Sequence, residues 1–586
     1  MLFWKDADSW FDYHQRFGPA NSLTHAVINH LERSARNVAL MDRMGTNPTA
    51  NLNLVIRKIE EEYWHTAPDA VANFRRNDVS GLLDVMAHLD GSANIPANEM
   101  WTMLNSSYRT WFSASALGAV GLTHFASIWP TVPAELHHHG VARIDAIPML
   151  IGKLASSLAG RGSEERQAML AELGAFSDGV NRAMHRKWLP TGQDTVPGRI
   201  SAIAATLMEY TGIHHIFDTT QAAVRETLAH NLGRNLDKDF AALDPHLSQM
   251  LGKYGIGEQE WNLLRAVPAT QADGRPYLTP RDARAVDRDA VEAMLRERGG
   301  IDADIKPDEV TAAVDQEINR LSDRLLAYYT DAAKHSTIGG GVRERAAMFG
   351  QTQPGTLQGE FWRHFALYKQ WPLAQLYQGL GREYYMSLSR SERVWNIGLI
   401  CGLSILGGYM RIALSNVASG APQHDPLDPK TMAAALAQGG GLGVFGDYFF
   451  SELGRAGAHP LETFGGPMVS DVSALAHILY GWRDMTLDDT GHRQNTGFGD
   501  LAHWTVRHIP FANLIYLRGA LNFMLWQHLY EAADPGYWDR VNRRLMKERG
   551  RTMLGYRPGA GVPYGVPPLY LRYPNGGSAG LLAGRE

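Results

Sequence analysis

The residue types that most often carry chemistry gather at His137, His138 and His139, three consecutive histidines that follow Glu135. Imidazole nitrogens bind transition metals and exchange protons near neutral pH. Adjacent residues on a helix point about 100° apart, so three consecutive histidines on one regular helix cannot all ligate one ion. We therefore interpret the run as a solvent-exposed loop before Gly140 and predict no metal site in it.

Other patterns also fall short of a catalytic or nucleotide-binding motif. His214 and His215 are adjacent, whereas the zincin helix needs histidines at i and i+4 around a glutamate. The glycine runs at 339–341 and 439–443 lack the Lys-Ser/Thr pair of a phosphate-binding loop. Cys401 lies in an apolar run, where a thiol is usually inert. The sequence therefore predicts a protein that is not an enzyme and that has no metal site and no cofactor.

Composition places the chain among ordinary folded proteins. Of its 586 residues, 45% are hydrophobic and 20% are charged, which excludes wholesale disorder. The net charge of −5 is small for this length, so binding to nucleic acid would have to rest on a local patch. A single cysteine excludes an internal disulfide framework and cysteine-rich zinc sites. The first residues show no apolar secretory segment, so we expect synthesis in a cytoplasm.

Apolar residues recur at three- and four-residue intervals in much of the chain, as they do in amphipathic helices. The pattern predicts a helix over 7–17 that ends at Gly18-Pro19, and another over 52–63 whose apolar side faces a core. The stretch 101–129 is apolar and rich in small residues, so we predict a buried helix there. Strict two-residue alternation between hairpin turns is missing, so strands should be few.

The predicted fold class is an all-α, elongated, multi-domain protein with few or no strands. Breaks in the pattern divide it into an N-terminal helical domain at 1–160 and a middle helical domain with a charged connector at 161–335. A glycine- and aromatic-rich helical domain with apolar helices follows at 336–555. The segment 556–586 is rich in Pro, Gly and Tyr, and we expect an extended tail there.

One apolar run stands out, because residues 394–410 carry no charge and approach the ~20 residues that a membrane-spanning helix needs. The runs 432–446 and 509–530 are weaker, since the first is short and Arg518 interrupts the second. All three are either buried core helices or helices that insert into a bilayer in one state of the protein only. The candidate membrane-contact residues are Trp395, Ile397, Leu399, Ile400, Leu403, Ile405, Leu406, Tyr409, Phe445, Phe449 and Phe450.

A basic segment lies at 539–551. Within it Arg540, Arg544 and Lys547 fall on one helical face, and Arg543 and Arg551 add further charge. The segment is either an ordinary solvated helix face or a contact site for phosphate, on DNA or on anionic lipid headgroups. These five residues are the candidate phosphate- and DNA-contact residues.

Four blocks of residues, spread along nearly the whole chain, form a recognisable pattern. The blocks are Phe3–Trp10 with Phe17-Gly18, Arg343–Ala346 with Gly355-Thr356 and Pro372-Leu373, Asp425-Pro426 with Asp428–Thr431 and Gln438–Gly443, and Asn513-Leu514 with Asp534-Pro535 and Arg557–Gly559. In these blocks the chain resembles the internal, DNA-ejection class of tailed-phage virion proteins, in a region shared with large phage polyvalent proteins.

The resemblance implies a structural protein that is packaged in the virion interior and ejected with the genome to help form a conduit across the host envelope. Its expected partners are further copies of itself, other ejection, portal or tail proteins, phage DNA and the host inner membrane. After ejection we expect it in the host periplasm and inner membrane. Larger relatives carry peptidoglycan-cleaving modules, which are not visible here. The alternatives are such a virion enzyme, or a static scaffold at the capsid core or portal.

Overall fold

The computed structural model describes residues 5–17, 23–116, 120–158, 163–175, 196–301, 306–367, 369–439, 471–476, 478–479, 497–512, 514–555, 571–572 and 578–579. Helices account for 77% of it and strands for 1%, which confirms the all-α class with few strands. The predicted membrane-contact residues Phe445, Phe449 and Phe450 lie outside the described residues, as does most of the predicted tail.

The helices of the first part of the chain run from the N-terminus to the long helix α17. They are α1 (Ala7–Phe17), α2 (Leu23–Met44), α3 (Pro48–Tyr63), α4 (Pro68–Asn73), η1 (Phe74–Asp78), α5 (Val79–Asp90), η2 (Ser92–Asn94), α6 (Glu99–Ala116), α7 (Val120–His138), α8 (Arg143–Leu158), α9 (Glu164–Glu172), α11 (Val196–Tyr210), α12 (Ile213–Gly233), η4 (Phe240–Ala242), α13 (Pro245–Lys253), α14 (Glu258–Arg265), α15 (Pro280–Ala283), α16 (Arg288–Glu297) and α17 (Pro307–Ser336).

The remaining elements include a second long helix, α22. They are α18 (Val342–Phe349), α19 (Leu357–Phe365), α20 (Gln370–Ala374), η5 (Gln375–Leu380), α21 (Gly381–Met386), α22 (Arg390–Ser419), α23 (Pro429–Gln438), α27 (Gly497–Arg507), α28 (Ile515–Leu521), η6 (Asn522–Trp526), α29 (Gln527–Ala533) and α30 (Tyr537–Arg549). Strands β1 (Thr270–Ala272) and β2 (Arg275–Tyr277) pair antiparallel, as do β3 (Leu571–Arg572) and β4 (Ser578–Ala579).

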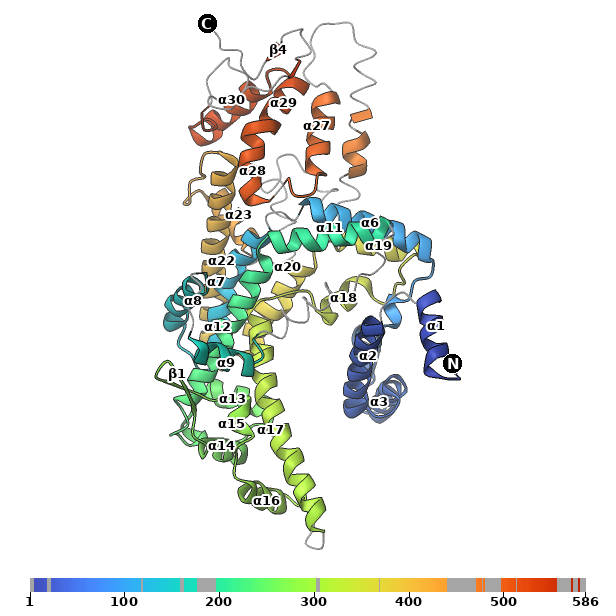
Figure 1. Ribbon diagram of the computed structural model, residues 1–586, viewed down its shortest axis with the longest axis vertical. Coiled ribbons are helices and arrows are strands. Elements are labelled where there is room, and N and C mark those ends of the chain that lie inside the picture. The colour runs from blue at the N-terminus through green and yellow to red at the C-terminus, as the bar shows by residue number, and fades with distance from the viewer. Residues whose placement is uncertain are drawn as a thin grey trace.

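Figure 1 shows the helices spread along one long axis, with α16 and the tip of α17 at one end and α27 to α30 at the other. Helices α7, α12 and α22 lie together near the middle of this axis. The N-terminal helices α1, α2 and α3 lie to one side, beyond α6 and α18.

The largest hydrophobic core forms around α7, α12 and α17. Helix α17 buries Val310, Val314, Leu321, Leu325 and Tyr328, which recur at three-, four- and seven-residue intervals on one face. Helices α8, α9, α13, α14, α15 and α16 and the β1–β2 hairpin add to the same core. This core includes residues on both sides of position 160, and the four-segment division of the chain stays a prediction.

The β1–β2 hairpin is held tightly against α12. Asp273 and Gly274 turn the chain with φ angles of 49° and 71°, as an Asp-Gly hairpin turn requires. A Cβ atom at Gly233 of α12 would lie 2.7 Å from the carbonyl oxygen of Pro276, so only glycine allows this approach. Tyr329 of α17 closes the other side, since its hydroxyl donates to the Leu278 carbonyl at 2.6 Å.

The N-terminal predictions are partly confirmed. Helix α1 has the predicted bounds, and α3 covers the predicted helix at 52–63. The prediction that α3 faces a core is confirmed only in part, because Ile56 is buried and Leu52 and Ile59 are half-buried, whereas Val55 is 52% exposed. The prediction of a buried helix over 101–129 is wrong in its first half. Helix α6 covers that half and leaves Trp101 44% exposed, whereas most residues of α7 from Ala126 onward are buried.

Candidate functional site

Helix α22 begins and ends at well-defined caps. Its first turn is fixed because the Ser389 hydroxyl accepts from the Glu392 N–H at 3.1 Å, and Glu392 Oε2 accepts from the Leu388 N–H at 2.9 Å. It ends at Gly420, whose φ of 70° is the left-handed conformation that glycine favours. Among the described residues, α22 is the one helix long and apolar enough to cross a membrane, and only 33% of its most apolar window is buried.

The buried face of α22 consists of small and polar residues together with two isoleucines. It comprises Asn396, Ile400, Ser404, Gly407, Gly408 and Ile412. A Cβ atom at Gly407 would lie 2.3 Å from the Ala126 carbonyl oxygen of α7, and one at Gly408 would lie 1.9 Å from the Ala435 oxygen of α23. The glycines therefore let α22 contact two helices backbone to backbone, as small residues do between helices in membranes.

The opposite face of α22 presents large apolar side chains to the outside. Val394 is 74% exposed, Trp395 69%, Leu406 49% and Val417 70%. A shallow depression of about 440 Å³ on this face is lined by Ser391, Val394, Trp395, Gly398, Leu399, Gly402 and Leu403. We call this side, from Val394 to Val417, the apolar face of α22. In other proteins, large contiguous apolar surfaces mark contact sites for lipid or for another protein.

The predicted membrane-contact residues do not all belong to the apolar face. Trp395 and Leu406 are exposed, Ile397, Leu399, Leu403, Ile405 and Tyr409 are half-buried, and Ile400 is buried. Ile405 and Tyr409 pack against the cluster of Ile412, Ala434 and Ala435, and the Tyr409 hydroxyl donates to the His424 carbonyl at 3.1 Å. Ile400, Ile405 and Tyr409 therefore pack α22 against its neighbours. The remaining described candidates for a membrane contact are Trp395, Ile397, Leu399, Leu403 and Leu406.

Basic side chains flank the uncharged part of α22. The Arg393 guanidinium lies 4.2 Å from the ring centroid of Tyr384, a cation–π contact. At the other end Arg411 donates to the Thr123 hydroxyl of α7 at 3.0 Å and to Gln438 of α23. The two arginines place positive charge at the ends of the apolar run, where basic residues flank membrane helices.

The basic helix α30 is fixed at its start by a buried carboxylate. Glu531 accepts from the Gly536 N–H at 2.7 Å and the Trp538 N–H at 3.1 Å. Burial raises the pKa of Glu531, against the effect of these two hydrogen bonds. Trp538 is buried and donates from its ring nitrogen to the Gln527 carbonyl at 2.9 Å, so the first turn of α30 is anchored to α29.

The five predicted phosphate-contact residues are all exposed, but some of them form ion pairs with acidic side chains. Arg540 pairs with Asp534, and Arg544 pairs with Glu548 at 2.7 Å. Arg543 and Lys547 make no ion pair among the described residues. Arg551 lines a polar cavity of about 450 Å³ together with Asp425, Asp428, Glu548 and Arg549. Acidic groups thus offset part of the basic charge, and Arg543 and Lys547 are the strongest remaining candidates.

The histidine run is a buried hub, so the prediction of a solvent-exposed loop is wrong. His138 and His139 are 2% and 0% exposed. The Nε2 atom of His138 lies 3.0 Å from Glu383 Oε1, and that of His139 lies 2.9 Å from Glu135 Oε1. The three side chains reach three different carboxylates, as expected for consecutive positions at the end of α7. The sequence could not reveal this burial, because the carboxylates of α21 and α22 come from a distant part of the chain.

Glu135 is the most strongly perturbed acid of this hub. Burial alone would raise its pKa, but the charge of Arg382 and the hydrogen bond from His139 outweigh burial and lower the pKa to about 2. The Arg382 guanidinium donates to Glu135 Oε1 at 2.9 Å. Burial lowers the pKa of His139, so its imidazole favours the neutral form. The hub therefore joins α7 to α21 and α22 by buried ionic and hydrogen-bonded pairs.

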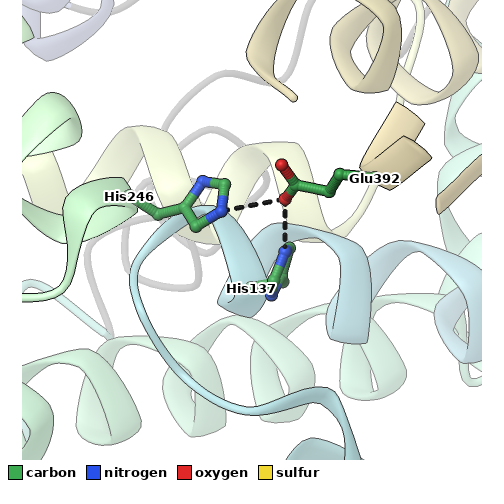
Figure 2. A group of neighbouring side chains, drawn as sticks. All are labelled: His137, His246 and Glu392. Carbon is green, nitrogen blue, oxygen red and sulfur yellow. Dashed lines mark hydrogen bonds and ion pairs between the residues drawn. The ribbon is translucent and has the colours of Figure 1, made fainter. Parts of the chain in front are cut away.

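The remaining member of the run, His137, reaches a third carboxylate. Figure 2 shows His137 of α7 and His246 of α13 pointing at the same oxygen of Glu392 of α22. Their Nε2 atoms lie 3.0 Å and 2.9 Å from Glu392 Oε1. Two imidazoles and one carboxylate could hold a metal ion. Sequence reasoning missed this cluster because its members lie far apart along the chain, and the histidine run was the one signal available.

No protein-family model matches the chain, and neither a curated protein nor a solved structure matches it. The resemblance to internal virion proteins therefore stays a prediction based on the residue blocks alone.

Proposed function

We propose that the chain is a structural internal virion protein of a tailed phage that is ejected and helps to form a conduit for the genome across the host envelope. The observation that carries this proposal is the packing of α22. Its small residues lie inside and its large apolar residues lie outside, which suits a helix that meets lipid or a partner. No catalytic role is part of the proposal.

Exposed apolar side chains on other helices support assembly into an oligomer. On α2, Leu31 is 61% exposed and Val38 is 64% exposed. On α3, Leu54 is 45% exposed and Val55 is 52% exposed. In a monomer these apolar side chains stay in contact with water. Contact with further copies of the chain would bury them, which is energetically favourable.

The helical architecture also suits transfer through a narrow channel. Hydrogen bonds within a helix are local, so the helices themselves re-form quickly after passage, whereas sheets rely on distant strand pairs. In this proposal α22 separates from α7 and α23 on ejection and turns its apolar face to the inner membrane. Arg543 and Lys547 of α30 would then contact DNA or lipid phosphate.

Vesicle binding and leakage by the full-length chain test the membrane part. The probe is vesicles of phosphatidylethanolamine and phosphatidylglycerol that contain a self-quenched dye, at acidic and at neutral pH. We expect flotation with the vesicles and dye release. Replacing Trp395 and Leu406 together by Glu should reduce both on the order of tenfold or more, because one charge at a helix centre opposes insertion by about 2.5 kcal/mol or more.

A control uses apolar residues elsewhere that are even more exposed than Trp395 and Leu406. Leu357 is 84% exposed and Tyr385 is 82% exposed, and both lie outside α22. Their double replacement by Glu should leave vesicle binding unchanged. Equal loss in both variants, or no leakage by the wild type at any pH, would contradict the proposal. Mass spectrometry of particles before and after triggered genome release tests the ejection part, and retention of the chain would favour the static scaffold.

A further inference from the structure

Three potential metal ligands converge where α7 ends and where α13 and α22 begin (Figure 2). One ligand atom from each of His137, His246 and Glu392 lies within 4.8 Å of the other two. The two imidazole rings are 4.6 Å apart between centroids and inclined at 50°. Both Nε2 atoms face the carboxylate, as ligands facing a shared ion do.

We propose that His137 Nε2, His246 Nε2 and Glu392 Oε1 bind one divalent transition-metal ion, with zinc as the best fit, and that this ion clamps the start of α22 to α7 and α13. Two histidines and one carboxylate are a ligand set typical of zinc. Calcium and magnesium are disfavoured because they prefer oxygen ligands. The proposal does not depend on the function proposed above.

Two of the three ligand–ligand distances are close to those around a zinc ion. A tetrahedral zinc ion with ligands at about 2.0–2.1 Å separates neighbouring ligand atoms by about 3.3 Å. The Nε2–Oε1 distances of 3.0 Å and 2.9 Å are shorter than this by a few tenths of an ångström. Small side-chain rotations would therefore open the hydrogen-bonded cluster enough for the ion, with the proton of each neutral imidazole carried on Nδ1 instead of Nε2.

The ligands are held in place by their own helix ends. Glu392 Oε2 accepts the Leu388 N–H at 2.9 Å, which leaves Oε1 for the ion. The side chains of His137, His246 and Glu392 are 23%, 11% and 19% exposed, so an ion can reach them while most bulk water is excluded. Three protein ligands leave a fourth position for water.

The positive charge of Arg143 opposes cation binding, and it is partly neutralised. Arg143 is held by Asn396 of α22 and lies 3.7 Å from Glu383 Oε2. The Arg143 guanidinium is attracted to the Glu383 carboxylate. This pairing reduces the repulsion between Arg143 and an ion bound at Glu392.

The test is metal titration of the full-length protein after it has been stripped with a chelator. Calorimetry with Zn²⁺ should give one tight site per chain, and Co²⁺ should give the visible absorption of a four-coordinate ion with nitrogen and oxygen ligands. The melting temperature should rise by roughly 2–4 °C at saturating Zn²⁺. Replacing His137 and His246 together by Gln should weaken this site on the order of a hundredfold or more and abolish the Co²⁺ spectrum.

The control variant is His215→Gln, which removes an exposed histidine of α12 outside the cluster. It should bind as the wild type does. If the double variant fails to fold by circular dichroism, the single variant His246→Gln takes its place. The proposal is overturned if the wild type binds no ion, or if the variants that lack the cluster histidines bind as tightly as the control.

Discussion

Helices α17 and α22 are the two longest helices of the described structure, and they pack by opposite rules. Helix α17 turns large residues such as Leu325, Tyr328 and Tyr329 inward and charged residues outward. Helix α22 turns Ser404, Gly407 and Gly408 inward and large apolar residues outward. The first arrangement gains stability from burying apolar area, whereas the second gains it from close backbone contact. Helix α17 thus forms part of the large core, and the packing of α22 supports the proposal that this helix meets lipid or a partner.

Two tryptophans offer the largest test of this contrast. Trp261 of α14 is 0% exposed, belongs to the large core and donates to the Lys238 carbonyl at 2.9 Å. Trp261→Ala should lower the free energy of unfolding by about 3–5 kcal/mol. Trp395→Ala, on the apolar face of α22, should change it by less than about 0.5 kcal/mol. Urea unfolding of both variants measures this, and similar losses would show that α22 is an ordinary core helix.

The histidine hub connects α7 of the large core to α22. Breaking the hub should destabilise the protein almost as much as Trp261→Ala. Glu135→Gln leaves Arg382 buried without a counter-charge and should lower the free energy of unfolding by about 3 kcal/mol at pH 7. The folded-state pKa of Glu135 is about 2 and its ordinary value is 4.5, so this stabilisation is fully present above pH 4.5. It is lost as the pH falls from 4.5 toward 2. The gap between wild type and variant should therefore narrow at pH 3, and a gap independent of pH would argue against the assigned charge.

Glycines on the two faces of α22 sharpen the contrast further. Gly408→Ala places a Cβ atom 1.9 Å from the Ala435 oxygen and should destabilise the chain by about 2 kcal/mol. Gly402→Ala meets nothing within 4 Å and should stabilise it by up to about 1 kcal/mol, because alanine is the better helix former. Thermal unfolding of the pair measures the difference. Equal effects would mean that α22 does not contact α23 as described.

The sequence predicted elements better than it predicted their surroundings. Helix α1 was predicted with its observed bounds, because apolar residues recur at helical spacing within 7–17 and the helix-ending pair Gly18-Pro19 follows. The uncharged run at 394–410 predicted a helix, but only the structure separates the buried Ile400 from the exposed Trp395. Exposure depends on which helix packs where. That information is non-local, as the cluster of His137, His246 and Glu392 also illustrates.

The smallest expected effect concerns the basic helix α30, which contrasts with the apolar face of α22 in its surface chemistry. Arg543 and Lys547 are exposed, whereas the charges of Arg540 and Arg544 are partly offset by acidic partners. If α30 contacts DNA phosphates, replacing Arg543 and Lys547 by Gln should reduce the slope of log affinity against log salt concentration by about 1–2.

Fluorescence anisotropy with a labelled DNA duplex at several salt concentrations measures this slope. The matched control replaces Arg540 and Arg544, which removes the same formal charge from the same helix. Because Asp534 and Glu548 already hold these two side chains, the control should change the slope less. An equal change in both variants would mean that DNA senses only the net charge of α30, and no change in either would remove α30 from the phosphate contact.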